Sequence, residues 1–389
     1  MPPVKAVFSQ LLDWVHPEQF RRCVQRYDGN YRVRSFSCWD QFLAMAFAQI
    51  TYRESLADIE TCLRSRPHQL YHMGFRSTIA HSTLAEANAS RDWRIYHDLA
   101  RLLITKARRL HANESFGVDL EQTVYALDAT TIDLCLSLFP WARFRSTKSA
   151  VKLHTLLDLR GSIPTMITIS EGKRADVSIL DDLVPEPGAF YVMDRGYLDF
   201  LRLHRFTRAG AFFVTRNKRG VRLRRVESRV FEPGTGVRSD QSVALVLPTS
   251  ANHYPERLRR VNYTDAESGK VLVFLTNNFD LPALTVARLY KSRWGVELFF
   301  KWIKQNLRIK HFYGTTDNAV KTQVWIAVCV YVLVAIVRKE LGLNQSLAQI
   351  LQILSVNAFE QVPLTELVTQ PDCKTKNSNF HNQLSLNGF

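Results

Sequence analysis

The sequence is poor in cysteine, and its six cysteines occur singly, with no Cys-x-x-Cys pair. Structural zinc sites depend on such close pairs, so a zinc site is not expected. A disulfide framework is typical of short secreted chains and is not expected either. The pattern fits a reducing cytoplasm, in which most cysteines serve as small core residues. They are Cys23, Cys38, Cys62, Cys135, Cys329 and Cys373.

The chain also lacks a long apolar run, and no secretory leader is expected. Its longest apolar stretch, 324–337, is shorter than the ~20 residues that a membrane-spanning helix needs. This stretch ends at Arg338, Lys339 and Glu340, which predicts a buried helix. No N-terminal segment combines a basic start, an apolar middle and a small-residue cleavage site. We therefore expect a cytoplasmic protein with no membrane partner.

Acidic residues are in deficit, with 36 Asp and Glu against 51 Lys and Arg and a net charge of +15. The length of 389 residues and the hydrophobic content of 46% are those of a soluble globular protein with a sizeable core. The positive excess implies a polyanionic partner, and the weak membrane signal favours nucleic acid. On charge alone, a basic protein that binds no polyanion remains the alternative.

Residues 1–115 are predicted to form a helical DNA-binding domain. Ser/Thr-x-x-Asp/Glu capping boxes at Ser37, Ser55 and Thr83 mark its helix starts. The apolar periodic runs that belong to them are 38–52, 55–64 and 83–111.

A helix-turn-helix is one interpretation of this domain. Segments 55–64 and 83–91 would be its two helices. The residues that would then face DNA are Ser82, Thr83, Asn88 and Arg91. The linker between the two segments is longer than the usual turn of three or four residues, so a plain helical packing domain is an equal alternative.

From about residue 120 the pattern changes to short β-rich runs. The expected strands are 123–127, 150–158, 163–170, 189–193 and 211–215, with helices over 175–183 and 197–209. A sheet order of 3-2-1-4-5 makes the first and fourth strands neighbours. The fold class is thus α/β with a mixed five-stranded sheet. The expected divisions are a core of 116–217 and 279–312, a β-rich, arginine-rich insertion of 218–278, and a helical C-terminal part with a polar tail, 313–389.

Two aspartates directly follow the strands that are expected to be neighbours. Asp128 follows the first strand and Asp194 follows the fourth, although either one alone is commonly a cap or turn residue. Two carboxylates placed side by side repel each other unless a proton or a cation lies between them. Ligand sets made only of oxygen suit Mg²⁺ or Mn²⁺ rather than zinc. Two such ions would stabilise the attacking and leaving oxygens of a phosphodiester displacement.

A third carboxylate lies on a predicted helix, 281–307. Five residues of this helix are spaced by three or four positions and so share one narrow stripe: Tyr290, Arg293, Glu297, Lys301 and Lys304. The residues on the opposite side would pack on the sheet: Val296, Phe299, Ile303 and Leu307. A solvated face with a Glu297–Lys301 ion pair would account for the charges. It would not account for the tyrosine or for the flanking Trp294.

The pattern Tyr290-x2-Arg293-x3-Glu297-x6-Lys304 resembles the signature of bacterial insertion-sequence transposases of the IS-four family. It is preceded by Asp128-Ala-Thr-Thr and Asp194-Arg-Gly-Tyr. These enzymes belong to the DDE group, which has a ribonuclease-H-like core. The stretch 31–43 also resembles the N-terminal domain of one branch, and the β-rich insertion is a family feature. The resemblance covers most of 10–340.

The resemblance implies a DNA transposase that moves its own element by cut-and-paste. Asp128, Asp194 and Glu297 would be catalytic and would hold two Mg²⁺ ions, for which Mn²⁺ could substitute. The residues expected to contact DNA are Tyr290, Arg293, Trp294, Lys301 and Lys304. Implied partners are double-stranded DNA with terminal inverted repeats, target DNA and a second copy of the chain in a synaptic complex. The setting would be the nucleoid of a bacterial cytoplasm, with a hairpin intermediate on the element's end.

Two rivals remain open on the sequence. A stand-alone metal-dependent nuclease would share the core and cut without joining. A non-catalytic DNA-binding remnant of an element would not need the three acids. In addition, Lys152 and His154 on the second strand could reach DNA near the metals, although mixed residues on a strand are usually only a sheet face.

Overall fold

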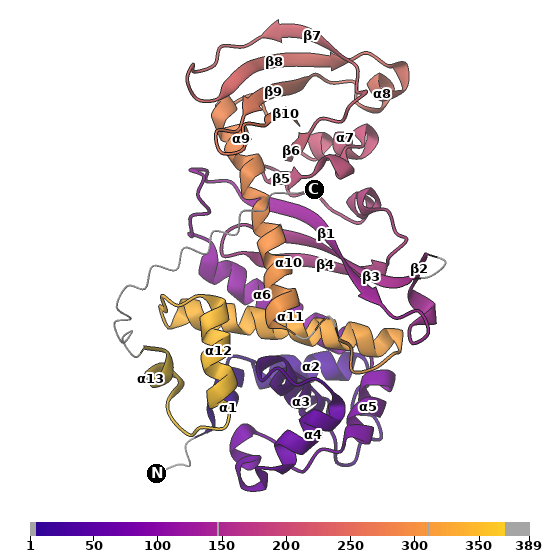
Figure 1. The fold of residues 1–389 in the computed structure, drawn as a ribbon, viewed down its shortest axis with the longest axis vertical. Coiled ribbons are helices and arrows are strands. Elements are labelled where there is room, and N and C mark those ends of the chain that lie inside the picture. The colour runs from indigo at the N-terminus through magenta and orange to yellow at the C-terminus, as the bar shows by residue number, and fades with distance from the viewer. Residues whose placement is uncertain (1–4, 146–147, 308, 310, 370–389) are drawn as a thin grey trace.

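The computed structural model describes residues 5–145, 148–307, 309 and 311–369. It is elongated, with a helical body at one end, a long sheet at the other, and a helical rod that joins them (Figure 1). The helices are α1 (Val7–Leu12), α2 (Pro17–Arg26), α3 (Cys38–Ile50), α4 (Leu56–Arg64), α5 (His81–Ser90), α6 (Arg94–His111), α7 (Phe200–Arg208), α8 (Pro248–His253), α9 (Ala283–Ser292), α10 (Trp294–Asn306), α11 (Asp317–Glu340), α12 (Leu347–Asn357) and α13 (Leu364–Thr369). The predicted polar tail and Cys373 lie outside the described residues.

Two of the three expected N-terminal helix starts are confirmed. Ser37 forms a full capping box at α3, and the Ser55 hydroxyl accepts the Asp58 N–H at α4. The third is wrong, because α5 starts at His81 and places Thr83 inside the helix. The expected single run over 83–111 is also wrong, since α5 and α6 are separate helices. Asp92 accepts the N–H of Arg94 at 2.8 Å, and this bond favours the break.

The C-terminal part supplies the centre of the helical body. Every residue from Val324 to Val337 is buried, as expected for the apolar run, and α11 packs against α3, α5 and α6. This helix is long and apolar enough to cross a membrane, yet 94% of its most apolar window is buried inside the protein. The segments 1–115 and 313–369, predicted as separate parts, therefore share one core.

A fragment of residues 1–115 is expected to be largely unfolded. Each large apolar side chain that α11 buries contributes roughly 1.5–3 kcal/mol, so losing the whole helix removes more than the ~5–15 kcal/mol that stabilises a typical domain. Circular dichroism and thermal melting would test this. The control is a fusion of 1–115 to 311–369, which should fold. A cooperative melt of 1–115 alone would contradict the shared core.

The described strands form one ten-stranded sheet. They are β1 (Val124–Leu134), β2 (Arg143–Arg145), β3 (Lys148–Asp158), β4 (Ile163–Glu171), β5 (Phe190–Met193), β6 (Phe212–Arg216), β7 (Leu223–Ser228), β8 (Val237–Leu245), β9 (Leu258–Thr264) and β10 (Val271–Thr276). Within it β4-β3-β1-β5-β6 follow the expected order, with β1 antiparallel to β3 and parallel to β5. The α/β class and the order of the core strands are confirmed.

The β-rich insertion continues this sheet and is not a separate layer. Strand β10 pairs antiparallel with β6, and β9, β8 and β7 follow outward to the far edge (Figure 1). The insertion thus adds four strands to the predicted five. The expected helix over 175–183 is only a short 3-10 segment, Asp176–Asp181. A second 3-10 segment, Arg195–Tyr197, precedes α7.

The expected helix 281–307 is present as α9 and α10, with a tight turn at Arg293. The Arg293 N–H bonds to the Tyr290 carbonyl at 3.2 Å, and the Val296 N–H bonds to the Arg293 carbonyl at 3.1 Å. These three-residue closures keep the two helices nearly in line as a rod that runs from the sheet to the helical body (Figure 1). The four apolar side chains predicted to pack inward are all buried: Val296, Phe299, Ile303 and Leu307.

Candidate active site

The strand register brings the two aspartates together. Leu127 of β1 lies opposite Met193 of β5, so Asp128 and Asp194 are the next residues on adjacent parallel strands, which are about 4.8 Å apart. One expectation needs correction, because β1 does not end at Asp128 and runs on to Leu134. Pairing with β3 sustains it, whereas β5 stops at Met193. Because β5 ends at Met193, no β5 residue pairs with Asp128, and Asp128 is open on that side.

The rod α9–α10 directs its polar stripe at these carboxylates. The Tyr290 hydroxyl donates to Asp194 Oδ1 at 3.2 Å. Arg293 Nη1 donates to Asp128 Oδ2 at 2.7 Å, and its Nη2 donates to Glu297 Oε1. The Arg293 guanidinium thus joins two of the predicted acids, and Tyr290 of the same stripe bonds the third.

The cluster holds more negative than positive charge. Burial is the largest influence on the pKa of Asp128 and raises it, the bond from the Ala129 N–H and the charge of Arg293 lower it, and the charges of Glu297 and Asp194 raise it further. Burial also raises the pKa of Tyr290 to about 12, so its hydroxyl stays protonated and donates. With all three acids ionised, a single guanidinium leaves an excess of negative charge.

The donor chemistry fits a hard divalent cation, since three carboxylates offer only oxygen ligands. Among the described residues, no three His, Cys, Asp or Glu side chains are already arranged to hold a metal ion. The position of Arg293 accounts for this, because its guanidinium lies between Asp128 and Glu297 and supplies the positive charge that a metal ion would bring.

The two lysines of the stripe differ in their surroundings. Lys304 Nζ donates to the Thr130 hydroxyl at 2.6 Å and to the Thr131 carbonyl at 2.9 Å, which ties α10 to β1. Lys301 is exposed, one turn beyond Glu297. Only Lys301 therefore points freely to solvent beside the acids.

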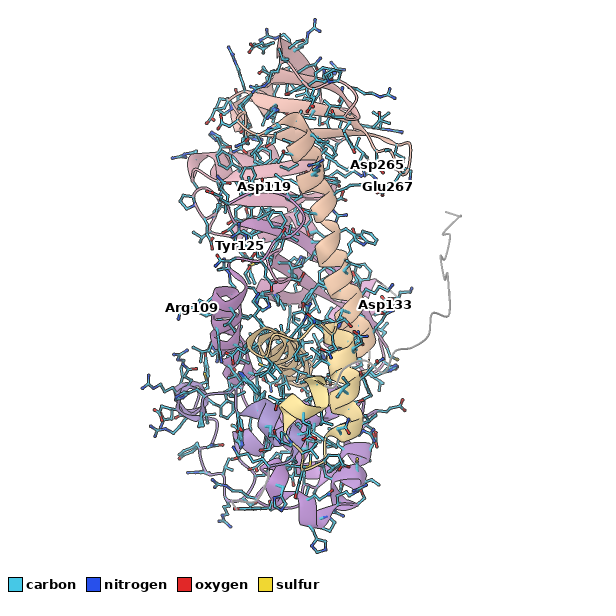
Figure 2. The ribbon with its side chains drawn as sticks, turned by 90° about the vertical axis from the view of Figure 1, so that its left-hand side faces the viewer. Arg109, Asp119, Tyr125, Asp133, Asp265 and Glu267 are labelled. Carbon is cyan, nitrogen blue, oxygen red and sulfur yellow. The ribbon has the colours of Figure 1, made fainter. Side chains whose placement is uncertain are left out.

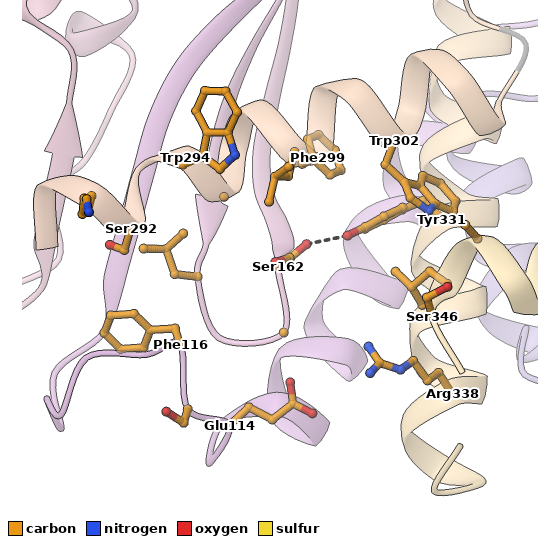
Figure 3. A pocket seen from close by; sticks show the side chains of 18 residues that line it. Glu114, Phe116, Ser162, Ser292, Trp294, Phe299, Trp302, Tyr331, Arg338 and Ser346 are labelled. Carbon is orange, nitrogen blue, oxygen red and sulfur yellow. Dashed lines mark hydrogen bonds between the residues drawn. The ribbon is translucent and has the colours of Figure 1, made fainter. Parts of the chain in front are cut away.

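Trp294 lies at the edge of the stripe and is 58% exposed. It lines a pocket of 650 Å³ beside the rod, together with Phe116 and Trp302 (Figure 3). Trp302 follows Glu297 by five residues, about 140° around the helix, so most of this pocket faces away from the acids. The floor is fixed by a bond of 2.8 Å from the Tyr331 hydroxyl to the Ser162 carbonyl.

The expected N-terminal DNA contacts do not fit the structure. Asn88 is 1% exposed, and its side chain accepts from Gln41 Nε2 at 2.8 Å. Arg91 donates to Gln41 Oε1 at 3.2 Å and to the Phe36 carbonyl. Both residues hold α5 against α3. A polar residue on a short helix was expected to be exposed, but α5 is covered by α3 and α11. Thr83 itself is exposed.

The expectation for Lys152 and His154 is also corrected. Lys152 Nζ pairs with Asp176 at 2.9 Å, and the buried His154 Nε2 lies 2.9 Å from the Ser170 hydroxyl. His154 is one register position away from the residue opposite Asp128, and successive strand residues alternate between faces. It therefore faces the other side of the sheet from Asp128.

His154 is expected to make stability depend on pH. Burial lowers the pKa of its imidazole to about 4, against ~6.5 in an unfolded chain. Between these values the unfolded state binds more protons, so this stabilisation is complete above about pH 6.5 and is lost as pH falls toward 4. Urea unfolding at pH 7 and pH 4.5 should differ by about 2–3 kcal/mol from this group. His154→Gln should remove this contribution to the difference between the two pH values. If the wild-type protein and the variant respond identically to pH, the assignment to His154 is wrong.

Two cationic residues near the acids were not predicted. Arg216 ends β6, the strand next to β5, and its charge lowers the pKa of Tyr290. Arg195 directly follows Asp194 and is exposed. The sequence could have indicated both cations, because the carboxyl ends of neighbouring parallel strands meet at one edge of a sheet. The sequence pattern ends this strand, 211–215, one residue before Arg216.

Comparison with known proteins assigns the chain to a family. Residues 119–333 match the model described as Transposase DDE domain, and residues 4–76 match a Domain of unknown function. The Putative transposase y4zB of Sinorhizobium fredii is 33% identical over 257 residues, which cover 65% of this chain and 70% of that protein. The Probable transposase for insertion sequence element IS5377 of Geobacillus stearothermophilus is 30% identical over 255 residues, 65% of this chain and 66% of that protein.

Among solved structures, a piggyBac transposase synaptic complex with hairpin DNA aligns over 95% of this chain and 83% of that one, with 10% identity and a TM-score of 0.44. The family assignment rests on the sequence matches, because one family model spans more than half of the chain and a relative is one-third identical. The chain therefore belongs to the DDE transposases of bacterial insertion sequences.

Proposed function

We propose that Asp128, Asp194 and Glu297 are the catalytic carboxylates of this transposase and that they hold two Mg²⁺ ions, with Mn²⁺ as a working substitute. Membership of the DDE family implies a divalent metal. The observation that carries the proposal is that Arg293 bonds both Asp128 and Glu297, beside the strand β5 that Asp194 directly follows. When bound, the metals would polarise the phosphate and activate water or a 3′-hydroxyl.

The chain's own residues would orient the acids and grip the DNA. The Tyr290 hydroxyl holds the carboxylate of Asp194 in place, and Lys304 fixes α10 on β1. Arg293 offers a planar fork that matches phosphate oxygens, so the scissile phosphate competes with the two acids for it. Lys301 is placed to bind a phosphate next to the acids. Trp294, on the rim of the neighbouring pocket, would pack against the same DNA.

The reaction we propose is hydrolysis of one strand at the element's end, followed by attack of the freed 3′-hydroxyl on target DNA. The substrates are double-stranded DNA with the element's terminal inverted repeats and a target duplex. Two copies would act together in a synaptic complex at the bacterial nucleoid. The helical body, rather than residues 1–115 alone, would bind the end. The formal charge of +15 supports a polyanionic partner.

The test is cleavage and strand transfer on paired duplexes that carry the inverted repeats found beside the gene. With Mg²⁺, the wild-type protein should cut at the repeat and join its 3′ end to a second duplex. Cleavage without joining would support a stand-alone nuclease instead. Binding without cleavage in Mg²⁺ and in Mn²⁺ would support a DNA-binding remnant.

The stripe predicts different effects for its two lysines. Lys301→Gln should lower the slope of log affinity against log salt by roughly 0.9, because this exposed cation is available to one phosphate. Lys304→Gln should also weaken the attachment of α10 to β1 and so lower the melting temperature. Filter binding from 0.05 to 0.5 M salt and thermal melting would separate the two. If both variants kept the wild-type melting temperature and the wild-type slope, the stripe would be only a solvated surface.

A further inference from the structure

The outer edge of the sheet carries a dense positive charge. Residues 216–230 contain six arginines and one lysine but a single acidic residue, Glu227. This segment spans the end of β6, the loop 217–222 and the whole of β7. Side chains project all around that end of the molecule, which is the end farthest from the helical body (Figures 1 and 2).

The arginines of the insertion differ in their surroundings. Those on or facing the inner strands have partners: Arg259 and Arg229 pair with Asp240, and Arg260 bonds Gln241. Four on β7 and the loop before it are exposed, and their side chains form no hydrogen bond or ion pair with a described residue. These four, named here the edge arginines, are Arg219, Arg222, Arg224 and Arg225.

The edge arginines repel one another without compensation. Four like charges within seven residues cost about 0.5 kcal/mol per close pair even in water. Arg224 lies opposite Ala244 and Arg225 opposite Val243, so neither meets an acid across the strand pair. Such a cluster is stabilised by a polyanion that spans several of its charges at once.

The edge strand lies at a defined distance from the acids. In the sheet, β7 is five strand steps from β5, because β6, β10, β9 and β8 lie between them. At about 4.8 Å per step this is roughly 24 Å, or about seven base pairs of duplex at 3.4 Å each. The positive segment starts at Arg216, beside the strand that precedes Asp194.

We propose that the edge arginines form a second DNA-binding site, which holds the phosphate backbone of a duplex about seven or more base pairs from the phosphate being cut. This inference rests on the proposed function, since it takes the duplex to be the one in the active site. Two DNA sources share this chemistry, the element's end and the DNA on the other side of the cut. Phosphate contacts carry no sequence information, so the site takes either.

Protection of the sheet edge is the main rival explanation, because charged residues on an edge strand prevent pairing with another chain. That role needs charge on β7 only, whereas Arg219 and Arg222 precede the strand. Pairing with β7 of a second copy is disfavoured, because it would bring eight arginines together.

The experiment measures binding in EDTA, so that it does not depend on cleavage, with a 40-base-pair duplex centred on the cleavage position. Arg224→Gln/Arg225→Gln should lower the salt slope by about 1.8, which weakens binding roughly 60-fold at 0.1 M salt and hardly at all near 1 M. Arg219→Gln/Arg222→Gln should act similarly and gives a second, independent test in the loop. The matched control is Lys270→Gln, an exposed cation of the same insertion, whose carbonyl accepts the Asp265 N–H at 3.0 Å. The nearby charges of Asp265 and Glu267 (Figure 2) repel phosphate. The control should leave the slope unchanged.

Duplexes trimmed on one side identify the source of the DNA. When the duplex is shortened to six base pairs on the side of the cut that the edge arginines contact, the difference in salt slope between wild type and the variants should disappear. Shortening the other side should leave that difference unchanged. The proposal is wrong if both double variants keep the wild-type salt slope. It is also wrong if the Arg224/Arg225 variant keeps that slope and aggregates, a result that would support protection of the sheet edge. A wild-type protein that binds with the expected slopes but never cleaves would count against the proposed function and leave this site standing.

Discussion

Asp194→Asn is expected to abolish strand cleavage, with a loss of at least about 10³-fold, and to leave the metal-free protein as stable as wild type or about 1 kcal/mol more stable. Asp194 bonds only the Tyr290 hydroxyl within the cluster, and an asparagine oxygen can accept the same bond. Removing its charge relieves repulsion by Asp128. The loss of cleavage follows because neutral amide oxygens are poor ligands for a hard divalent cation.

Asp128→Asn is the matched comparison, because it should abolish cleavage equally and change stability in the opposite direction. Asp128 is the acceptor at 2.7 Å for Arg293, whose side chain is 15% exposed. Loss of that charge leaves the guanidinium with Glu297 alone, which should cost about 1–3 kcal/mol. Two variants with the same catalytic defect and opposite stability changes would be hard to obtain from a general folding defect.

Both effects are measurable on one preparation. Urea unfolding in EDTA gives the stability change, and a cleavage assay in Mg²⁺ gives the rate. Mg²⁺ should raise the melting temperature of the wild-type protein and not that of either variant, because only an intact site gains binding energy. Wild-type cleavage by either variant would remove that residue from the site. Equal stability changes would show that Arg293 does not discriminate between the two acids.

The position of Arg293 also bears on how metal and DNA binding are coupled. The guanidinium neutralises part of the acid cluster when no metal is present, and the same group is a ligand for phosphate. DNA that draws Arg293 away would leave the acids more negative and raise their affinity for metal. By linkage, metal would raise the affinity for DNA by the same factor. With such coupling, the site would become competent for cleavage only when its DNA substrate is bound.

The positions of the core strands were predictable from the sequence, because each strand is a short β-rich run bounded by turns. Their order does not follow from the runs and was taken as 3-2-1-4-5. The side-by-side placement of Asp128 and Asp194 followed from that order alone. The length of β1 was not predictable, since its continuation past Asp128 depends on pairing with β3. The same holds for the width of the sheet, because only the β6–β10 pairing shows that the insertion extends it.

The helix stripe was predictable from its spacing, whereas the state of its side chains was not. Periodicity shows that Arg293 and Glu297 share a face, but not that Arg293 bonds two acids. The N-terminal contacts failed for a related reason. A sequence pattern treats Asn88 as an exposed polar residue, while long-range packing by α11, which is more than 200 positions away, buries it.

Arg259→Ala should have the largest effect on stability, a loss of about 3–5 kcal/mol. Arg259 and Asp240 are both 2% exposed and form two bonds, at 2.9 and 2.7 Å. Its third nitrogen donates to the Leu281 carbonyl at 2.6 Å, just before α9. Truncation would leave Asp240 as a buried charge with only the longer contact to Arg229, at 3.7 Å. Urea unfolding would measure the loss.

The third bond of Arg259 links the insertion to the rod α9–α10, so cleavage should fall by more than the folded fraction does. A shift of ~1 Å in α9 would displace Tyr290 and Arg293 and can cost ~100-fold in rate. Arg260→Gln, which removes a partly exposed bond to Gln241, is the control and should cost under about 1 kcal/mol. Arg259→Met/Asp240→Leu should recover most of the stability, since apolar residues can replace a buried pair, but not the rate. Full recovery of cleavage in that double variant would show that the bond to Leu281 does not position the rod.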